Sequence, residues 1–393
     1  MTLPLVFTEF DRAAMARALA LAERGLATTQ PNPRVGCVIA QDERIVGEGW
    51  HERAGEPHAE VNALRAAGGL AVGATAYVTL EPCSHHGRTP PCVEALIGAR
   101  VARVVFALQD PNPRVSGRGA EGLRRAGIAV DSGLLAAEAT ELNPGFLKRM
   151  RFGRPWVRVK LAMSLDGRTA LASGASRWIT GPAAREDVQH WRARSSAILT
   201  GIGTVLADDP RLTVRLPEPT NGRPRPQPLR VVLDAQLQTP PQARLLMERG
   251  SVLIMTAAAP GASDAGLAAR RSQLVAKGAE IEEVPAGVDT SAGAGTGTRA
   301  VGLSLPEVLD RLGRREVNEL WVEAGPRLAG ALLQQSLADE LLLYVAPRLL
   351  GPQGRPLAEI AEVRQLEDAP RLAIIETRPI GEDLRLRLRR TAS

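Results

Sequence analysis

One histidine and two cysteines limit how this chain can fold more than any other feature. His58, Cys83 and Cys92 are all zinc-ligand types, and Glu60 follows His58 closely. Three protein ligands leave the fourth position of a tetrahedral Zn²⁺ open for water, whose pKa the metal lowers to about 7. Two thiolates, one neutral imidazole and Zn²⁺ sum to zero charge, so the site tolerates partial burial. The fold therefore has to bring three separated segments to one point.

Glu60 gives this zinc pattern a catalytic interpretation. A carboxylate that does not ligate the metal can carry a proton from water to a leaving nitrogen, as in zinc-dependent nucleobase deaminases. Those enzymes contain Pro-Cys-x-x-Cys, whereas eight residues, Ser84 to Pro91, separate the two cysteines here. The alternative is a structural zinc, which is normally closed by four protein ligands. His85 or His86 could supply the fourth, so this alternative stays open.

Composition argues against a nucleic-acid partner. Aromatic residues are only 3% of the 393, which leaves few platforms on which bases can stack. The net charge is +6, but residues 1–150 hold 16 basic and 16 acidic side chains, so the excess lies after residue 150. A deaminase that grips a polynucleotide needs a basic surface around its zinc site. We expect a small-molecule substrate instead.

The number of cysteines and the hydropathy of the sequence indicate the cellular compartment of the protein. Its three cysteines, Cys37 and the two candidate ligands, form no disulfide framework, which fits a reducing cytoplasm. No run of about 18 apolar residues occurs, so we expect no membrane segment.

Residues 1–150 alternate helical and strand patterns, which is typical of a layered α/β domain. His58 and Glu60 then lie on one helix, and Cys83 follows a strand. Cys92 lies near a helix N-terminus, where the helix dipole favours a thiolate. We predict helices over 10–24, 58–67, 90–97 and 119–126, a hairpin of strands over 35–40 and 45–50, and strands over 75–80, 101–108 and 128–130.

A second α/β domain is predicted over 151–393, after a linker near 151–155. The segments 217–228 and 287–302 are rich in turn formers and are predicted to be loops. The tail 384–390 alternates Leu and Arg, which predicts a half-exposed strand. Further strands are predicted over 156–162, 197–200, 229–233, 252–256, 319–322 and 341–345.

Glycine-rich turns follow two of these strands, at Gly201 and Gly325. Such turns can present backbone N–H groups to phosphates. The second domain has no complete Gly-x-Gly-x-x-Gly fingerprint, however, and a tight strand-to-helix connection without a ligand explains the glycines equally well.

Longer runs identify a family. The chain resembles the bifunctional deaminase/reductase family of riboflavin biosynthesis over nearly its whole length, and this family uses the long spacing between cysteines. The runs that carry the resemblance are 30–36, 55–61, 79–92 and 110–113 in the first half, and 160–168, 176–180, 203–210 and 321–326 in the second.

For residues 1–150 the resemblance implies a cytidine-deaminase-like α/β/α domain that hydrolytically deaminates a phosphorylated pyrimidinone. It implies that His58, Cys83 and Cys92 hold Zn²⁺ and that Glu60 is the proton shuttle. Substrate contacts are implied for Asn32, His51, His85 and Arg88. Asn32 between two prolines also suits a plain turn, and His51 an ordinary strand end.

For residues 151–393 the resemblance implies a dihydrofolate-reductase-like α/β domain in which NADPH delivers hydride to C1′ of the substrate ribose. Implied NADPH contacts are Ala162, Trp178, Thr204, Asp208, Gly325, Pro326, Arg327, Leu328, Ala329, Gly330 and Ala331. Implied substrate contacts are Ser176, Arg192, Leu212, Arg215 and Glu323, with the two arginines gripping the phosphate bidentately. The roles of Lys160 and Asp166 stay open, and Asp166-Gly167 also suits a turn.

The sequence thus predicts a cytoplasmic enzyme, a homo-oligomer by family resemblance, that acts on small phosphorylated pyrimidines and binds neither nucleic acid nor membrane. Two alternatives remain: a deaminase acting on tRNA, and a binding protein with a structural zinc. The neutral first half opposes the former, and Glu60 opposes the latter.

Overall fold

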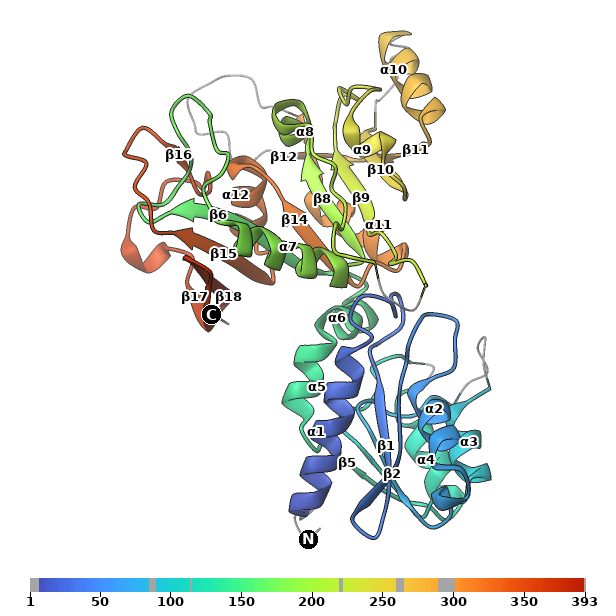
Figure 1. Ribbon diagram of the computed structural model, residues 1–393. Coiled ribbons are helices and arrows are strands. Elements are labelled where there is room, and N and C mark those ends of the chain that lie inside the picture. The colour runs from blue at the N-terminus through green and yellow to red at the C-terminus, as the bar shows by residue number, and fades with distance from the viewer. Residues whose placement is uncertain are drawn as a thin grey trace. The chain divides into compact units, whose positions relative to one another are not determined.

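The computed structural model describes residues 7–84, 90–113, 115–218, 222–258, 265–288 and 301–391. The chain divides into two compact units, Met1–Gly153 and Arg154–Ser393 (Figure 1). Helix α6 (Pro144–Phe152) continues past residue 150, so the linker is shorter than predicted and the domain boundary lies after the helix. In these described ranges no helix is long and apolar enough to cross a bilayer.

The N-terminal unit contains a five-stranded sheet in the order β2-β1-β3-β4-β5. β1 runs antiparallel to β2 and β3, whereas β3, β4 and β5 are parallel. The carboxyl ends of β3 and β4 therefore open at the same edge of the sheet. The strands are β1 (Gly36–Gln41), β2 (Arg44–Trp50), β3 (Thr75–Val78), β4 (Arg103–Phe106) and β5 (Ala129–Ser132).

Helices cover both faces of this sheet, which confirms the predicted α/β/α layering. One core lies under α2 (Ala59–Ala67), α3 (Cys92–Gly98) and α4 (Arg118–Arg125), and the other lies under α1 (Glu9–Glu23) and α5 (Ala136–Leu142). A short 3-10 turn, η1 (Gly68–Ala71), follows α2.

The C-terminal unit contains a nine-stranded sheet in the order β11-β10-β9-β8-β14-β6-β15-β18-β17. The strands from β11 to β15 are parallel to their neighbours, and β18 and β17 are antiparallel. The strands are β6 (Trp156–Ser164), β8 (Ala197–Gly201), β9 (Leu229–Leu233), β10 (Val252–Ala257), β11 (Ala279–Val284), β14 (Glu319–Glu323), β15 (Glu340–Ala346), β17 (Leu372–Ile380) and β18 (Asp383–Arg390).

Helices again lie on both faces of the sheet (Figure 1). α11 (Leu305–Arg314) and α12 (Pro326–Gln334) cover one core, while α7 (Pro182–Arg194), α8 (Ile202–Asp208), α9 (Arg244–Met247) and α10 (Ala265–Ala276) lie over the other. Smaller elements are the paired strands β7 (Arg168–Ala170) and β16 (Arg355–Pro356), the paired strands β12 (Ala286–Val288) and β13 (Val301–Leu303), and η2 (Leu366–Asp368).

A buried row of charges crosses the central strands of the large sheet near their N-terminal ends. Arg158 on β6 donates to Glu319 on β14 at 2.9 Å and to Glu340 on β15 at 2.7 Å. Arg387 and Arg389 on β18 also reach Glu340, each at 3.1 Å. A buried charge is costly unless it is paired and hydrogen-bonded. These acidic partners therefore compensate the arginines.

The tail is a strand, as predicted, but Arg385, Arg387 and Arg389 do not lie on a solvent-exposed face. The side chain of Arg385 is only 5% exposed, because it pairs with Asp187 and Glu376. Its neighbour Leu384 is 36% exposed. Alternating Leu and Arg thus marks a strand with one apolar face and one ion-paired face.

The other predicted strands and the hairpin are present, with ends shifted by a few residues. The helix predicted over 90–97 begins at Cys92, because Pro91 precedes it in an extended conformation. The described part of 217–228 contains no element, as predicted. The described ends of the loop predicted over 287–302 belong instead to the paired strands β12 and β13, and the rest of that range lies outside the described residues. The edge strands β11 and β17 were not predicted.

Candidate active sites

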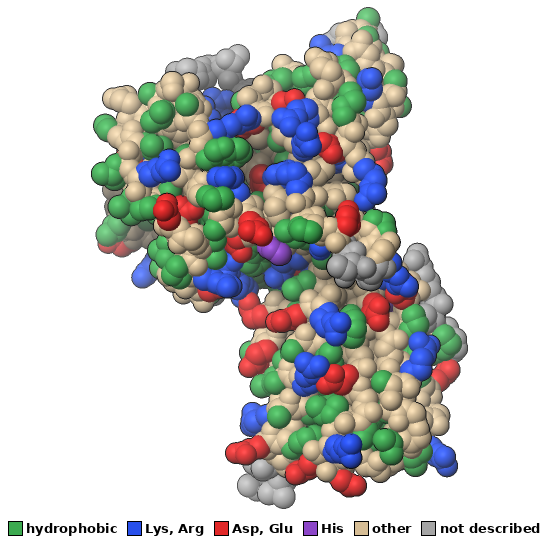
Figure 2. Space-filling view, viewed as in Figure 1, with side chains coloured by type: hydrophobic (Ala, Val, Ile, Leu, Met, Phe, Trp, Pro, Cys, Tyr) green, Lys and Arg blue, Asp and Glu red, His purple; other side chains and the backbone are tan. Residues whose placement is uncertain are grey.

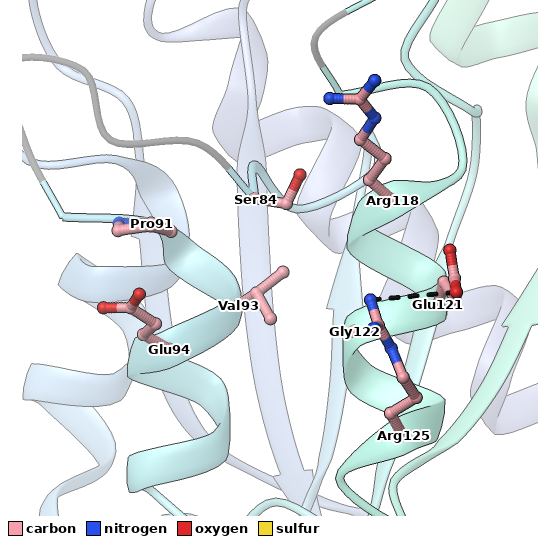
Figure 3. A pocket seen from close by; sticks show the side chains of 8 residues that line it. All are labelled: Ser84, Pro91, Val93, Glu94, Arg118, Glu121, Gly122 and Arg125. Atoms are coloured by element: carbon pink, nitrogen blue, oxygen red, sulfur yellow. Dashed lines mark ion pairs between the residues drawn. The ribbon is translucent and has the colours of Figure 1, made fainter.

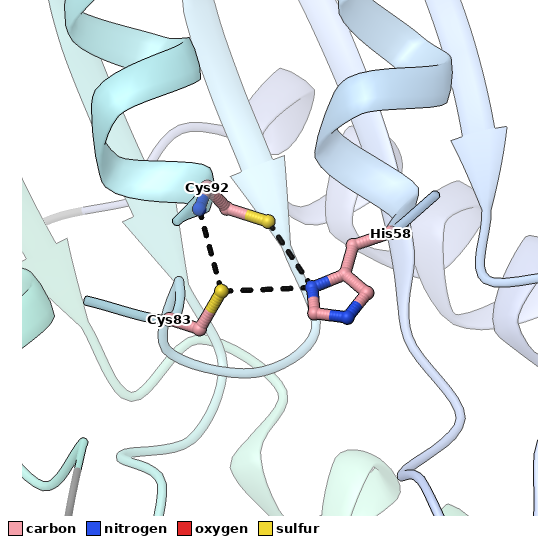
Figure 4. A group of neighbouring side chains, drawn as sticks. All are labelled: His58, Cys83 and Cys92. Carbon is pink, nitrogen blue, oxygen red and sulfur yellow. Dashed lines mark hydrogen bonds between the residues drawn. The ribbon is translucent and has the colours of Figure 1, made fainter. Parts of the chain in front are cut away.

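Three segments of the N-terminal unit meet at His58, Cys83 and Cys92 (Figure 4). His58 is the N-cap of α2, Cys83 lies in the loop after β3, and Cys92 is the first residue of α3. Nδ1 of His58 lies 3.5 Å from Sγ of Cys83 and 3.3 Å from Sγ of Cys92. The predicted ligand set is therefore assembled at one point.

These separations fit zinc. Zn–S bonds of about 2.3 Å and Zn–N bonds of about 2.0 Å at tetrahedral angles place sulfur and nitrogen roughly 3.5 Å apart. Cys92 is buried, while His58 and Cys83 are half-buried. Across the described part of the chain, no other His, Cys, Asp or Glu joins the group. His85 and His86, the alternative fourth ligands, lie outside the described residues.

The two cysteine thiols have pKa shifts of opposite direction. Hydrogen bonding from the Cys92 thiol, together with the ring of His58, lowers the pKa of Cys83 to about 4. The same contact with Cys83, together with burial, raises the pKa of Cys92. A bound divalent cation favours both thiolates, because its charge offsets their repulsion.

Glu60 lies in the first turn of α2 and is 3% exposed. Burial and the nearby Cys83 raise the pKa of its carboxyl group. A raised pKa makes a carboxyl group hold its proton more readily, which suits a group that accepts and then donates a proton. Glu60 thus lies buried close to the candidate ligands, and its role as a proton shuttle stays a prediction.

His51, a predicted substrate contact, is bonded at both ring nitrogens. It is 2% exposed, and burial lowers its pKa, which favours the neutral ring. Nδ1 lies 3.1 Å from the carbonyl oxygen of Pro57, so we assign the proton to Nδ1. Nε2 then accepts from the Asn32 amide at 3.1 Å. Both ring nitrogens are therefore engaged, one of them with Asn32, and the substrate contact of His51 stays a prediction.

The remaining predicted deaminase contacts, His85 and Arg88, lie outside the described residues. A hollow of 440 Å³ lies between α3 and α4 (Figure 3). Ser84, Arg118 and Arg125 are among the residues that line it. None of the three ligands lines this hollow, so it is distinct from the metal centre.

Sequence reasoning assigned no role to two buried acids beside the metal centre. Glu81 is 3% exposed and accepts hydrogen bonds from three backbone N–H groups. Asp110 is 6% exposed, and burial raises its pKa to about 6. Both lie within runs that carry the family resemblance, and the signal that could have found them is an acid that closely follows a buried strand.

In the C-terminal unit Arg192 and Glu323 form a bidentate pair. Nε and Nη2 of Arg192 lie 2.6 Å and 2.7 Å from the two carboxylate oxygens of Glu323. Trp321 Nε1 also donates to Glu323 at 2.7 Å. Burial alone raises the pKa of Glu323, but the charge of Arg192 prevails and lowers it to about 2. The Arg192 edge predicted to grip a phosphate is thus occupied by Glu323.

Arg215 lies close enough to Arg192 for the two charges to repel. Burial and this neighbouring cation lower the pKa of Arg215. Lys160 is also nearby, and its pKa is lowered by burial and by Arg192, against the opposing charge of Glu323. These three cations and one carboxylate leave a net positive region, which suits a phosphorylated ligand.

The other predicted substrate contacts differ in accessibility. Ser176 is half-buried in the segment between β7 and α7. Leu212 is 1% exposed because its side chain packs in the core beside Trp191 and Trp321. Only the backbone of Leu212 can therefore contact a ligand.

The predicted NADPH contacts occupy four segments. Gly325 is the N-cap of α12, and it and Arg327 are exposed. Ala329 and Gly330 are buried on the inner side of this helix, so their side-chain positions face the protein rather than a cofactor. Intermediate exposure is found at Pro326, Leu328, Ala331, Ala162 and Thr204.

Trp178 and Asp208 are exposed, and the backbone carbonyl of each accepts a hydrogen bond from an arginine. Nη1 of Arg348 donates to the carbonyl of Trp178 at 3.2 Å, and Nη2 of Arg177 donates to the carbonyl of Asp208 at 2.9 Å. Asp166 accepts from the backbone N–H of Gly351 at 2.8 Å. Asp166 therefore holds the loop at Gly351, and the Asp166-Gly167 turn is confirmed.

The folds and the two sites define a class: a zinc-dependent deaminase-type domain followed by a reductase-type domain. Two family models match the chain accordingly. Residues 8–108 match the "Cytidine and deoxycytidylate deaminase zinc-binding region", and residues 155–386 match the "RibD C-terminal domain". The second model covers more than half of the chain.

The chain belongs to the RibD family. It is 51% identical to riboflavin biosynthesis protein RibD of Escherichia coli K12, over 96% of this chain and 99% of that protein. RibD of Acinetobacter baumannii, a solved structure, is 44% identical with a TM-score of 0.86 and covers 98% of this chain and 99% of its own. A deaminase/reductase structure from Thermotoga maritima is 30% identical with a TM-score of 0.80, covering 97% and 99%.

This protein is therefore a bifunctional deaminase and reductase of riboflavin biosynthesis that uses Zn²⁺ and NADPH. The N-terminal unit is cytidine-deaminase-like and the C-terminal unit has the dihydrofolate-reductase-like RibD fold, as predicted. The nucleic-acid deaminase and the binding protein are not favoured.

Proposed function

We propose that the Met1–Gly153 unit deaminates 2,5-diamino-6-(5-phosphoribosylamino)pyrimidin-4(3H)-one. The Arg154–Ser393 unit then reduces 5-amino-6-(5-phosphoribosylamino)uracil to its ribityl form. The observation that carries this proposal is the group of Nδ1 of His58 and the two cysteine sulfurs, with Glu60 buried beside it. The Thermotoga maritima relative is named as a diaminohydroxyphosphoribosylaminopyrimidine deaminase and 5-amino-6-(5-phosphoribosylamino)uracil reductase, which supports the same pair of activities.

In the deaminase unit, His58, Cys83 and Cys92 would hold Zn²⁺, which supplies Lewis-acid activation of water when bound. Glu60 moves a proton from the attacking water to the nitrogen of the leaving amine. Asn32, oriented by His51, offers an amide whose donor and acceptor together can read a pyrimidine edge.

In the reductase unit, NADPH supplies the hydride for C1′ of the ribose. Glu323, held by Arg192, presents a fixed carboxylate that can accept from ribose hydroxyls. Arg215 lies beside this pair and can bind the substrate phosphate. Figure 2 shows several Lys and Arg side chains gathered on the face of this unit that is in view.

The test is incubation with the diaminopyrimidinone phosphate, with and without NADPH, followed by mass spectrometry. Without NADPH we expect only the mass change of an amine replaced by oxygen, and with NADPH we expect two further hydrogens. Glu60→Ala should abolish ammonia release while zinc stays bound, because Glu60 is not a ligand. Ammonia release that survives in Glu60→Ala would contradict the proposed proton shuttle.

We also propose that the protein forms a homo-oligomer in the cytoplasm. Ile374 and Ile375 on the edge strand β17 are 61% and 43% exposed, and an exposed apolar edge strand favours self-association. The candidate zinc thiols need a reducing compartment. Light scattering of the purified chain tests the oligomer, and a monomeric mass would contradict it.

A further inference from the structure

We propose that Glu81 is a positioning residue of the metal centre. Its carboxylate fixes the Glu81-Pro82-Cys83 loop to the N-terminus of α4, and thereby holds Cys83 within reach of His58 and Cys92. The inference rests on the proposed deaminase centre and adds to it a group that touches neither metal nor substrate.

The hydrogen bonds of Glu81 carry the argument. One carboxylate oxygen accepts from the backbone N–H of Gly117 at 3.0 Å and of Asp110 at 3.3 Å. The other accepts from the N–H of Ala120 at 3.1 Å. Gly117 is the N-cap of α4, so two of the donors belong to the unpaired first turn of that helix. Glu81 thus acts as the cap that α4 lacks locally.

Close packing shows that α4 and the loop are pressed together. A Cβ at Gly119 of α4 would lie 2.1 Å from the carbonyl oxygen of Pro82, a distance that no side chain tolerates. On its other side the loop is bonded to α3. The N–H of Val93 donates to the carbonyl of Cys83 at 3.2 Å, and the N–H of Cys92 donates to Sγ of Cys83 at 3.3 Å. Cys83 is therefore fixed between two helices.

An amide cannot replace this carboxylate. All three partners of Glu81 are donors, and a glutamine has only one acceptor oxygen. In Glu81→Gln at least one buried N–H group would face the NH₂ group of the amide, which costs the desolvation of both donors. Mutation of a group that orients a metal ligand without binding the metal itself typically lowers metal affinity or activity by about 10–100-fold.

The experiment compares Glu81→Gln with Glu81→Asp and with a matched control, Glu121→Gln. Glu121 lies in the first turn of the same helix but is exposed, and it pairs with Arg125 at 3.8 Å (Figure 3). Zinc affinity is measured by competition with a chromophoric chelator, and the ligand geometry is followed by the visible spectrum of the Co²⁺-loaded protein. NADPH oxidation in the same chain reports the amount of folded reductase unit, which serves as the reference for protein concentration.

We expect Glu81→Gln to weaken zinc binding about tenfold or more, to shift the Co²⁺ bands, and to lower kcat of ammonia release with KM nearly unchanged. Glu81→Asp, which keeps the acceptor oxygens and is the second variant if the amide prevents folding, should recover part of each loss. The proposal is overturned if Glu81→Gln matches Glu121→Gln in zinc affinity and spectrum, or if Glu81→Asp is no better than the amide. A native protein that binds zinc but releases no ammonia would instead overturn the proposed function.

Discussion

Replacing Glu323 with glutamine tests the electrostatics of the reductase site. Its carboxylate is the counter-charge of Arg192, and the two are joined by two short hydrogen bonds. A pKa of about 2 instead of 4.5 means that the folded protein favours the ionised carboxylate by about 3 kcal/mol. Breaking a buried pair by removing one partner costs about 3–5 kcal/mol. The pKa shift and the usual cost of breaking a buried ion pair therefore both predict that Glu323→Gln lowers the free energy of unfolding by about 3 kcal/mol at pH 7.

The pH dependence has a definite sign. Because the pKa of Glu323 is lower in the folded protein, its contribution is fully present above the unfolded value of 4.5. It is lost as the pH falls through about 2. The difference in unfolding free energy between native protein and variant should therefore be constant from pH 6 to 8 and shrink below about pH 4.5.

The assay is urea unfolding followed by tryptophan fluorescence. Trp321 donates to Glu323 and stacks on Trp191 at a centroid separation of 6.1 Å, so the probe reports this core. Glu362→Gln is the control, since that carboxylate is 78% exposed. A loss below about 1 kcal/mol in Glu323→Gln, the range of exposed pairs, would refute the reasoning, as would a loss equal to that of the control.

Two further substitutions test the other contacts. His51→Ala should raise KM for the diaminopyrimidinone about fivefold with zinc content unchanged, because Asn32 loses one hydrogen bond worth roughly 1 kcal/mol. The steady-state kinetics of ammonia release give KM. An unchanged KM would favour the alternative that Asn32 only shapes a turn. Gly330→Ala should cost about 1–3 kcal/mol of stability, because its Cβ would lie 1.8 Å from the carbonyl oxygen of Glu359. Thermal unfolding tests this against Gly325→Ala, which has open space; equal melting temperatures would contradict the close packing.

Local patterns predicted the central strands well, because buried strands of a parallel sheet contain continuous apolar runs. Leu229–Leu233, for example, is a strand with the predicted bounds. Edge strands such as β11 (Ala279–Val284) contain several glutamates and lack this signal. The strand over 384–390 was predicted, but its buried arginine face was not, because the acids that pair with it come from distant segments.

The zinc ligands and Glu60 were predictable because few residue types bind zinc and the chain has few cysteines. The partners of the substrate-site residues were not predictable. The engagement of His51 with Pro57 and of Arg192 with Glu323 depends on tertiary contacts. Glu81 lies within a run that carries the family resemblance, yet its partners lie 29–39 residues further along the chain.

The buried row of charges has a consequence for the reductase site itself. Side chains alternate between the faces of a strand, so Lys160 lies on the same face of β6 as Arg158. For the same reason Glu323 lies on the same face of β14 as Glu319. If β6 slipped by one residue, its side chains would all change faces. Arg158 would then point into the apolar core, and Lys160 would leave the site at the same time. The ion pairs at one end of these strands thus fix the strand register, and this register also positions the ligand-binding groups at the other end.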